Sequence, residues 1–553
     1  MKTESGSGAR GQSRASIVHE LVVAIAATLL AVLAMAVFIT TARGQFMLYD
    51  GDSLVLEIAR QSFLSGGPQD WSMSAVLFVF PELPIYLGLR SLLPTTQLAM
   101  VVNGILNLTV LYLLLRSIAG SITRDSRRPT FAAFVAFSVV VICLLTEHTA
   151  DRESFELVSM IVMPTYYYGS ALAGMACVAL VLSLLRSTTS ERPSAMRARI
   201  IGLAVIAALA TASNPIFVIW AGAAVLGVLV LLVLVRRLHA RAAAVASIPL
   251  GIGIAAGMLA RIPLARFSSP AALSYFNPNR ASEALLYGPR QAFQLFHSGI
   301  RGTVEGCILV MLIAAAVVAF VLCWRRRHRP DRLFLAAVGI AAPLGVLIVT
   351  VVSGATSARY LQPWYLAPLL SVLVLVDLIG EARLLVLPQF GRLTRGIWRG
   401  GLAGASLFAL VASIAVLAPV SSGRYARPDC LLHWIGDRRL VGAGQYWDTR
   451  DLIAYGGSSV RLAQISSDLT IFPWLVNIAP FYRAKVSYLV SSDPNWLHEI
   501  ALRIGAPSNV VVCDDYVVAD YAGTPGAQAL TASVNDSARN VGRAQGFLPP
   551  ARP

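Results

Sequence analysis

Residues 21–57, which read "LVVAIAATLLAVLAMAVFITTARGQFMLYDGDSLVLE", indicate the kind of fold that this chain adopts. The opening run, Leu21–Thr40, is long and apolar enough to cross a bilayer as a helix, which takes about 20 residues. Three carboxylates, Asp50, Asp52 and Glu57, follow this run almost at once. Acids at a membrane face belong to a solvated turn, a metal site or a catalytic centre, and the rest of the sequence bears on that choice.

The composition is that of a membrane protein with several spans. The 553 residues have a mean hydropathy of +0.67, and 13% of them are charged, whereas a soluble domain carries about 25% charged residues. In a soluble protein the net charge of +16 would suggest nucleic acid as a partner. Here the basic residues lie mostly in short loops between apolar runs, so we expect a lipid bilayer and no nucleic acid.

Eleven apolar runs are predicted to span the membrane, and the arginines between them set the orientation. The predicted spans lie near residues 18–41, 98–116, 130–147, 165–185, 200–213, 215–235, 241–260, 304–323, 332–352, 361–379 and 401–420. With the N-terminus in the cytoplasm, every arginine-rich short loop falls on the cytoplasmic side, as the positive-inside rule requires. Because lysine occurs only at Lys2 and Lys485, arginine supplies nearly all the basic charge. Such a preference for arginine is typical of a GC-rich bacterial genome, so we expect a protein of the bacterial inner (cell) membrane.

Ala75–Leu93 tests this count, because it is apolar enough to span. Pro81 and Pro84 interrupt it around Glu82, and proline disfavours a continuous helix. If this segment spanned, the arginine pattern would invert. We therefore expect a re-entrant or surface-lying element on the outer face. The large outer loops are then residues 42–97, 148–164 and 261–303, within a membrane domain of residues 1–420.

After the last span, residues 421–522 alternate short β-like runs with helical stretches. This pattern predicts a small extracytoplasmic α/β domain with a mostly parallel sheet. The strands are expected at Leu440–Trp447, Val460–Ile465, Lys485–Val490, Val510–Cys513 and Tyr516–Asp520, and the helices near Thr449–Tyr455, Pro473–Asn477 and Asn495–Ile504. Outside the cytoplasm Cys430 and Cys513 have the chance to pair, with two free thiols as the alternative. The small, polar tail 523–553 is expected to be disordered.

The outer loops collect the unusual polar residues. Leu54–Leu64 separates apolar from charged positions and is expected to form a short amphipathic helix along the membrane. The second loop, "TEHTADRESFE", adds His148 and a second acidic pair, Asp151 and Glu153. Two acidic clusters repel each other unless a cation, a proton or an arginine balances them.

These residue types permit two kinds of chemistry. Carboxylates suit Mg²⁺ or Mn²⁺ as ligands, and a single carboxylate can instead deprotonate a hydroxyl as a general base. Arginines are available to bind a phosphate, and the candidates are Arg359 with Tyr360, Arg261 and Arg266. The plainer interpretations are a turn for Asp50-Gly51, an exposed histidine for His148 and an interfacial anchor for Arg359. Glu82 is costly in an apolar segment unless it faces protein or water.

The acidic pair in "YDGDS" directly after the first helix, the "DRE" of the second loop, about eleven spans and an outer C-terminal domain resemble the GT-C class of membrane glycosyltransferases. The resemblance implies a polyprenyl-phosphate sugar donor and a hydroxyl acceptor on an envelope glycan, lipid or protein. It also implies that Asp50 or Asp52 is the base of one inverting displacement. Asp151, Glu153, His148 and Glu82 would assist or bind a cation, and Arg359, Tyr360, Arg261 and Arg266 would hold the donor phosphate.

Two other classes of function stay open from the sequence. A transporter, flippase or glycan ligase is one, and a scaffold whose outer domain binds partners is the other. Transporters tend to carry charges at mid-membrane in two related halves. Here the charges cluster at the outer face and no halves repeat, which favours the enzyme.

Overall fold

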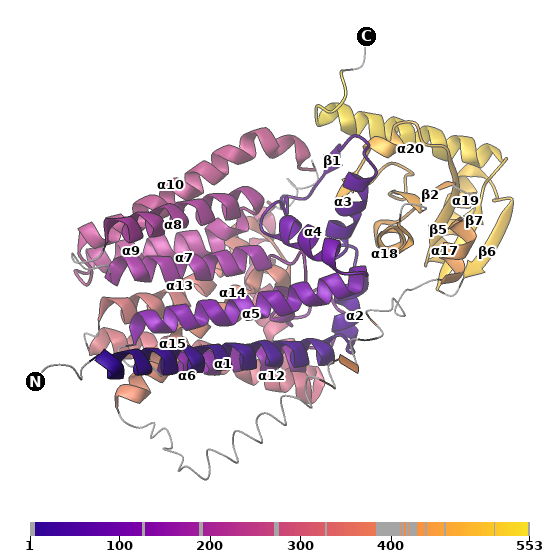
Figure 1. Cartoon of the computed structure of the whole chain (residues 1–553). Helices are drawn as coiled ribbons and strands as arrows, with labels where there is room; N and C mark the ends of the chain where they lie inside the picture. The colour runs from indigo at the N-terminus through magenta and orange to yellow at the C-terminus, as the bar shows by residue number, and fades with distance from the viewer. Residues whose placement is uncertain are drawn as a thin grey trace, which may run out of the picture. The chain divides into compact units, whose positions relative to one another are not determined.

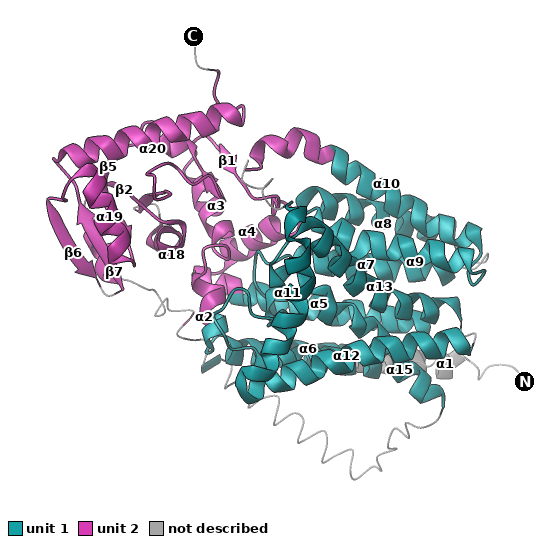
Figure 2. Cartoon of the chain, turned by 180° about the vertical axis from the view of Figure 1, so that it is seen from behind, with its two compact units in different colours: residues 1–44, 101–259, 275–418 teal, residues 45–100, 260–274, 419–553 magenta. Residues whose placement is uncertain are grey.

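The protein is described by a computed structural model, in which two compact units are distinguished (Figure 2). The described residues are 6–123, 128–186, 192–269, 276–326, 329–382, 411, 414, 415, 418, 420, 429–436, 440–457, 460–513 and 515–550. Unit 1 comprises residues 1–44, 101–259 and 275–418, and unit 2 comprises residues 45–100, 260–274 and 419–553. The last segment of unit 2 begins at Pro419, close to the boundary predicted at residue 421, and this unit also contains residues 45–100 and 260–274.

Unit 1 is a bundle of long apolar helices (Figure 1), and the helices that contain residues 44–45, 100–101 and 259–260 continue into unit 2 (Figure 2). Its helices are α1 (Gly6–Phe38), α2 (Ala42–Tyr49), α5 (Thr96–Ile122), α6 (Arg128–Thr146), α7 (Tyr168–Arg186), α8 (Pro193–Ser213), α9 (Ala223–Leu234), α10 (Ala240–Leu264), α11 (Ala281–Gln294), α12 (Gly299–Arg325), α13 (Pro330–Ser353), α14 (Pro363–Leu366) and α15 (Pro368–Glu381). The short helices η1 (Ser159–Ile161), η2 (Val218–Gly222) and η7 (Ala358–Leu361) complete it.

The predicted membrane spans are largely confirmed. Within the described residues, nine helices are long and apolar enough to cross a bilayer, and a shorter apolar helix covers Val218–Leu234. These ten helices match ten of the predicted spans, whereas the eleventh, near 401–420, lies almost wholly outside the described residues. Large apolar side chains such as Ile201 and Ile262 lie 61% and 69% exposed on these helices, as expected of surfaces solvated by lipid.

Ala75–Leu93 does not form a spanning helix, as predicted. It is irregular up to Pro81 and becomes helical only in α4 (Glu82–Leu92), which has 11 residues. The amphipathic stretch before it forms α3 (Val55–Leu64), also as predicted. Both elements belong to unit 2.

The C-terminal part of unit 2 is a five-stranded sheet with helices on both faces. The strands run in the order β3 (Arg461–Gln464), β2 (Val441–Gly444), β5 (Val486–Ser491), β7 (Tyr516–Asp520) and β6 (Asn509–Cys513). The pairings among β3, β2 and β5 are parallel, and those among β5, β7 and β6 are antiparallel. The sheet is therefore mixed and not mostly parallel, because only two residues separate β6 from β7 and a connection that short returns the chain antiparallel.

Two helices cover each face of this sheet. On one face, α17 (Asp429–Gly436) and α18 (Tyr446–Gly456) pack a core around Tyr488 and Val490. On the other face, α19 (Pro494–Ile504) and α20 (Pro525–Ala544) pack a core around Val486 and Leu489. Asp493 caps α19 by accepting a hydrogen bond from the backbone N–H of Asn495.

Two predictions for this region are wrong. The tail after residue 523 is ordered through α20, since Leu530, Val534 and Ala538 recur every four residues and bury one face of that helix in the core. The helix expected at Pro473–Asn477 is instead extended. Its end, β4 (Val476–Asn477), pairs antiparallel with β1 (Trp71–Ser72) of the first loop. A partner strand distant in sequence therefore overrides the local tendency.

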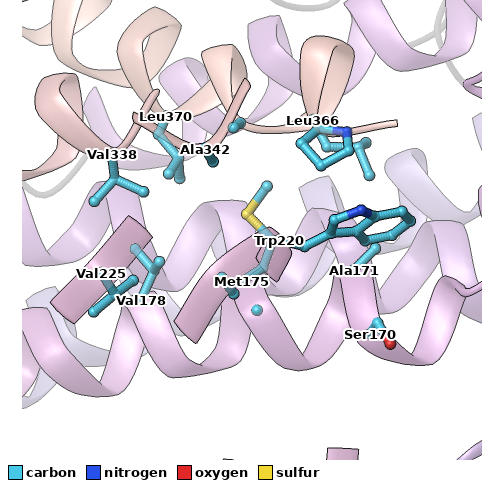
Figure 3. A pocket seen from close by; sticks show the side chains of 14 residues that line it. Ser170, Ala171, Met175, Val178, Trp220, Val225, Val338, Ala342, Leu366 and Leu370 are labelled. Carbon is cyan, nitrogen blue, oxygen red and sulfur yellow. The ribbon is translucent and has the colours of Figure 1, made fainter. Parts of the chain in front are cut away.

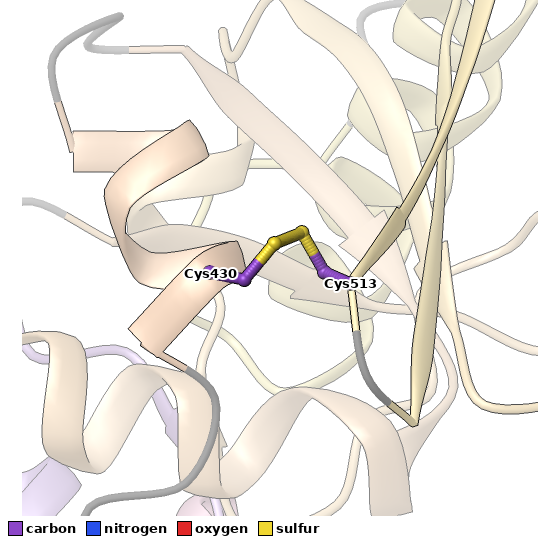
Figure 4. The surroundings of a disulfide bond; sticks show 2 residues. All are labelled: Cys430 and Cys513. Atoms are coloured by element: carbon purple, nitrogen blue, oxygen red, sulfur yellow. A yellow bond between two sulfur atoms is a disulfide. The ribbon is translucent and has the colours of Figure 1, made fainter.

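Cys430 and Cys513 form a disulfide bond, with Cα atoms 5.5 Å apart (Figure 4). The bond joins α17 to the end of β6 and closes a sequence separation of 83 residues. Of the two alternatives left by the sequence, pairing is the one observed.

Candidate active site

Asp50 and Asp52 lie in a tight turn of unit 2 that joins α2 to α3. Asp50 is 4% exposed, and its Oδ2 accepts a hydrogen bond from the backbone N–H of Asp52 at 3.0 Å. Asp52 is half-buried, and its Oδ1 accepts a hydrogen bond from the hydroxyl of Tyr446 at 2.6 Å. The pair is thus unequal: Asp50 is buried and shapes the turn, while Asp52 is more accessible.

Helix α18 of the C-terminal sheet holds this turn in place. The guanidinium of Arg450 is fully buried and donates to the carbonyls of Leu475 at 2.8 Å and Gly51 at 3.4 Å. Burial, followed by the nearby charge of Asp52, raises the pKa of Tyr446 well above its usual range, so this phenol stays a protonated donor. Arg450 supplies a positive charge that offsets part of the charge of the two acids.

Glycine at position 51 lets α18 approach this closely. A Cβ added to Gly51 would lie 3.0 Å from Cγ of Arg450, 3.0 Å from Cε1 of Tyr446 and 3.2 Å from Cε3 of Trp447. The absence of a side chain at Gly51 therefore leaves space for Tyr446, which donates to Asp52, and for Arg450.

The charged face of α3 lines a polar groove of unit 2. Glu57 is 2% exposed and accepts hydrogen bonds from Arg60, Gln61 and Tyr86. Arg60, Gln61 and Arg90 line the groove, which has a volume of about 500 Å³. Desolvation, followed by the charge of Glu57, raises the pKa of Tyr86 well above its usual range, so Tyr86 is a fixed donor.

The apolar face of α3 lines a second groove of unit 2, with a volume of about 250 Å³. Val55, Leu56 and Phe63 contribute from α3, and Phe267 contributes from the other side. The helix therefore separates a polar groove from an apolar one.

Of the arginines predicted to hold a phosphate, two lie in unit 2 next to these elements. Arg261 is half-buried and donates to the carbonyl of Ala75 at 2.7 Å. Arg266 is exposed and lies 4.8 Å above the ring of Phe267, which lines the apolar groove. Glu82 is 1% exposed in the first turn of α4, where the helix dipole stabilises a carboxylate.

In unit 1, Glu153 joins three elements. Its carboxylate accepts hydrogen bonds from the hydroxyl of Tyr287 on α11, from Oγ of Ser357 at 3.1 Å and from the backbone N–H of Ala358 at 2.9 Å. The second acidic loop and the segment that carries Arg359 therefore meet in this unit. Glu153 braces that segment.

Arg359 lies just before the tenth predicted span, next to a group of aromatic side chains. It is half-buried and lies 5.8 Å above the ring of Tyr360. The ring of Tyr360 stacks on Tyr167, with centroids 6.2 Å apart, and its carbonyl accepts a hydrogen bond from Nε1 of Trp220 at 3.1 Å. These contacts fix the backbone that presents the guanidinium.

His148 and Asp151 also have structural partners. Nδ1 of His148 lies 3.2 Å from Oε1 of Glu156, and the Oδ1 of Asp151 accepts the backbone N–H of Glu153 at 2.9 Å. The carbonyl of Asp151 accepts a hydrogen bond from the fully buried Arg43 at 2.8 Å. Both residues therefore help to fold the second outer loop.

The carboxylates of the second outer loop are engaged by donors of the protein itself. The oxygens of Glu153 are shared among three donors, and Oε2 of Glu156 accepts the backbone N–H groups of His148 and Thr149. Among the described residues, no group of three or more His, Cys, Asp or Glu side chains is placed to hold a metal. Binding of Mg²⁺ or Mn²⁺ stays a prediction.

Unit 1 also contains a cavity of about 50 Å³ among the membrane helices (Figure 3). Met175 and Val178 of α7, Trp220 of η2 and Leu370 of α15 are among its lining residues. A space this small and apolar holds neither a sugar nor a phosphate, so it is not a candidate active site.

The structure brings the predicted residues together in two groups. Asp50 and Asp52 belong to unit 2, while Asp151, Glu153 and Arg359 belong to unit 1. That all of them line one cavity stays a prediction.

Sequence reasoning missed several residues that organise these groups. Tyr446 and Arg450 were predicted only as parts of a strand at Leu440–Trp447 and a helix near Thr449–Tyr455. Glu57 was named among the acids of the first outer loop but was given no role. For Arg43 and Glu305 a signal was available. Both are charged, lie at the ends of apolar runs and are 0% exposed, and charges at such positions are costly unless they have a role.

Comparison with known proteins gives structural likeness only. No family model matches the sequence, and no curated protein matches it. The crystal structure of ArnT from Cupriavidus metallidurans bound to undecaprenyl phosphate is similar with a TM-score of 0.49 and 15% identity, over 90% of this chain and 98% of that one. The apo crystal structure of the same protein gives a TM-score of 0.46 and 15% identity, over 94% of this chain and 99% of that one.

Proposed function

We propose that this protein is a GT-C-type glycosyltransferase. It would move a sugar from a polyprenyl-phosphate donor to a hydroxyl of an envelope glycan, lipid or protein outside the cytoplasm. The observation that carries the proposal is the Asp50–Asp52 turn, whose second carboxylate is half-buried and accepts a hydrogen bond from a buried tyrosine, while a buried arginine holds the backbone of the turn at Gly51. A carboxylate fixed in this way is suited to act as a general base.

Asp52 is the proposed base because Asp50 is 4% exposed and is engaged in the turn. Asp52 takes the proton of the acceptor hydroxyl as the oxygen forms its bond to the anomeric carbon. The bond from that carbon to the phosphate oxygen breaks, and its electron pair leaves with the polyprenyl phosphate. This single displacement inverts the anomeric configuration.

Arginine is the proposed counter-charge for the leaving phosphate, since its planar fork binds phosphate oxygens in pairs. Arg359 is the first candidate because Glu153 and the Tyr360 ring system hold its backbone. Arg261 and Arg266 are the candidates in unit 2. The apolar groove beside α3 has the chemistry required by an isoprenoid chain.

The disulfide supports the placement of the C-terminal region outside the cytoplasm, because such bonds persist in oxidising compartments. The arginine-rich loops support a cytoplasmic N-terminus.

Transfer by the purified full-length protein in lipid nanodiscs tests the proposal. The protein is mixed with a polyprenyl-phosphate sugar that is radiolabelled in the sugar, together with a cell-envelope extract. We expect labelled acceptor and an equal amount of free polyprenyl phosphate. A flippase would leave the sugar–phosphate bond intact, so recovery of all the label in unbroken donor would contradict the proposal.

A further inference from the structure

The polar groove of unit 2 contains more positive charge than its own carboxylate needs. It is formed by α3, by Arg90 near the end of α4, by the start of α5 and by the end of α18. Of the described residues that line it, one is acidic, Glu57, and two are basic, Arg60 and Arg90. The groove therefore carries one positive charge in excess.

Glu57 does not require Arg90 as a partner. A carboxylate offers about four acceptor positions. On Oε1 these are taken by Arg60 at 2.7 Å and Gln61 at 3.1 Å, and on Oε2 by Arg60 at 3.0 Å and Tyr86 at 3.0 Å. Nε of Arg90 lies 3.5 Å from Oε2 without a hydrogen bond to it, and Nη1 of Arg90 donates to the carbonyl of Leu93 at 2.8 Å. Arg90 therefore adds a second positive charge beside a carboxylate whose acceptor positions are already taken.

Both arginines reach the open space. The side chain of Arg60 is 21% exposed and that of Arg90 is 18% exposed, whereas the side chain of Glu57 is only 2% exposed. The acid is therefore covered by the cations, and a ligand in the groove meets guanidinium groups. Partial burial strengthens their attraction for an anion relative to a fully solvated pair.

The groove shares two helices with the acidic turn. Asp52 precedes α3 and Arg60 follows eight residues later, which is about 12 Å at the helical rise of 1.5 Å per residue. On α18, Tyr446 contacts Asp52, while Ala454 accepts a hydrogen bond from Gln61 at 2.8 Å. The two helices thus connect the turn at one end to the groove at the other.

We propose that this groove binds an anionic group, a carboxylate or a phosphate, carried by the acceptor. The acceptor is then an acidic glycan, and its anion is held by Arg60 and Arg90 while a hydroxyl further along the same molecule reaches Asp52. The assignment to the acceptor rests on the proposed function. The binding of the anion does not, because it needs no turnover.

Equilibrium binding to the full-length protein in nanodiscs tests the groove with glucuronate as the anionic probe and glucose as the neutral one. We expect glucuronate to bind at least about tenfold more tightly than glucose, which is the gain of one charge-assisted hydrogen bond. Arg90→Gln should abolish this preference and Arg90→Lys should keep most of it. Equal binding of the two sugars by the unsubstituted protein would overturn the proposal.

Glu57→Gln provides a variant with the opposite expectation. It raises the excess charge of the groove from one to two, so glucuronate should bind more tightly than to the unsubstituted protein. Arg461→Gln, which removes an exposed arginine of the same unit outside the groove, is the control and should leave glucuronate binding unchanged. If Arg90→Gln and Arg461→Gln have the same effect, the groove is not the site.

Geranyl phosphate distinguishes the acceptor from the donor. If the groove serves the acceptor, Arg90→Gln weakens glucuronate and leaves geranyl phosphate unchanged. Loss of geranyl phosphate binding, with or without loss of glucuronate binding, would assign the groove to the donor and overturn the proposal. Should glucuronate bind as expected while no sugar transfer is found in any assay, the proposed function fails and the anion site stands.

Discussion

The hydroxyl of Tyr446 donates to Oδ1 of Asp52 across 2.6 Å, and the two residues are 394 positions apart in the chain. The C-terminal sheet therefore has a role beyond capping the protein, since its helix α18 supplies the residues that orient the acid pair of the first outer loop. The first prediction concerns this hydrogen bond.

Tyr446→Phe should lower the rate of sugar transfer by about tenfold or more, since hydrogen bonds to charged groups are worth about 1.5–3 kcal/mol. Because the raised pKa of Tyr446 keeps the phenol protonated, it remains a donor to Asp52 at every working pH. The matched control is Tyr482→Phe, which removes a similar 2.8 Å hydrogen bond to Asp70 and should leave the rate of transfer unchanged.

Gly51→Ala should lower transfer without unfolding the protein. The added methyl group meets Arg450 and Tyr446 at 3.0 Å, and such overpacking costs about 1–3 kcal/mol. Gly67→Ala in the same loop is the control, because its Cβ would find only Oγ of Ser65 at 3.9 Å. Initial rates and thermal unfolding of both variants decide the matter, and equal rates for the two would contradict the assigned role of Gly51.

Arg450→Leu should destabilise unit 2 by about 1–3 kcal/mol for each of the two buried carbonyls, those of Gly51 and Leu475, that lose their donor. The measurement is the thermal unfolding of the full-length protein followed by limited proteolysis. Arg461→Leu removes an exposed arginine from the edge strand β3 and should have little effect. A comparable loss of thermal stability in the two variants would mean that the buried position of Arg450 is unimportant.

Glu153→Ala should raise the KM for the polyprenyl-phosphate donor. The substitution releases Ser357 and Ala358, directly before Arg359, so the guanidinium is held less well. Glu283→Ala serves as the control, since it removes an exposed carboxylate that pairs with Arg280 at the start of α11. If Glu153→Ala changed only kcat, with KM unaltered, the bracing role would be refuted.

Loss of the disulfide in a Cys430→Ser/Cys513→Ser variant should destabilise the C-terminal sheet. Closing a loop of 83 residues is worth about 4.5 kcal/mol in the chain-entropy model. Cys307→Ser, at an exposed free cysteine, is the control. Urea unfolding monitored by the fluorescence of the sheet region provides the measurement, and an unchanged midpoint for the double variant would contradict the expectation.

Much of the membrane fold was predictable because apolar length and arginine position are local properties. Runs such as Leu21–Thr40 have no stable alternative to a helix in lipid, and the prolines around Glu82 mark where a span fails. The five strands were also found, although only β5, β6 and β7 are rich in valine. The order of the sheet was harder, since pairing depends on residues distant in sequence.

The candidate site was predictable only in part. The acidic turn was found from its place after the first helix, whereas its partners Tyr446 and Arg450 were not, because no local pattern connects residues almost 400 positions apart. The ordered tail was missed for a related reason. Its small residues are typical of a disordered segment, and the helix is ordered because Leu530, Val534 and Ala538 pack against the sheet.

The most direct test of the account compares Asp52→Asn with Asp70→Asn in the nanodisc transfer assay. Both replace an aspartate that accepts a tyrosine hydrogen bond in unit 2, but only Asp52 is the proposed base. We expect Asp52→Asn to reduce transfer by at least about a hundredfold, as for the loss of a general base, and Asp70→Asn to stay near the unsubstituted rate. Equal transfer by the two variants would contradict the assignment of Asp52 and with it the proposed mechanism.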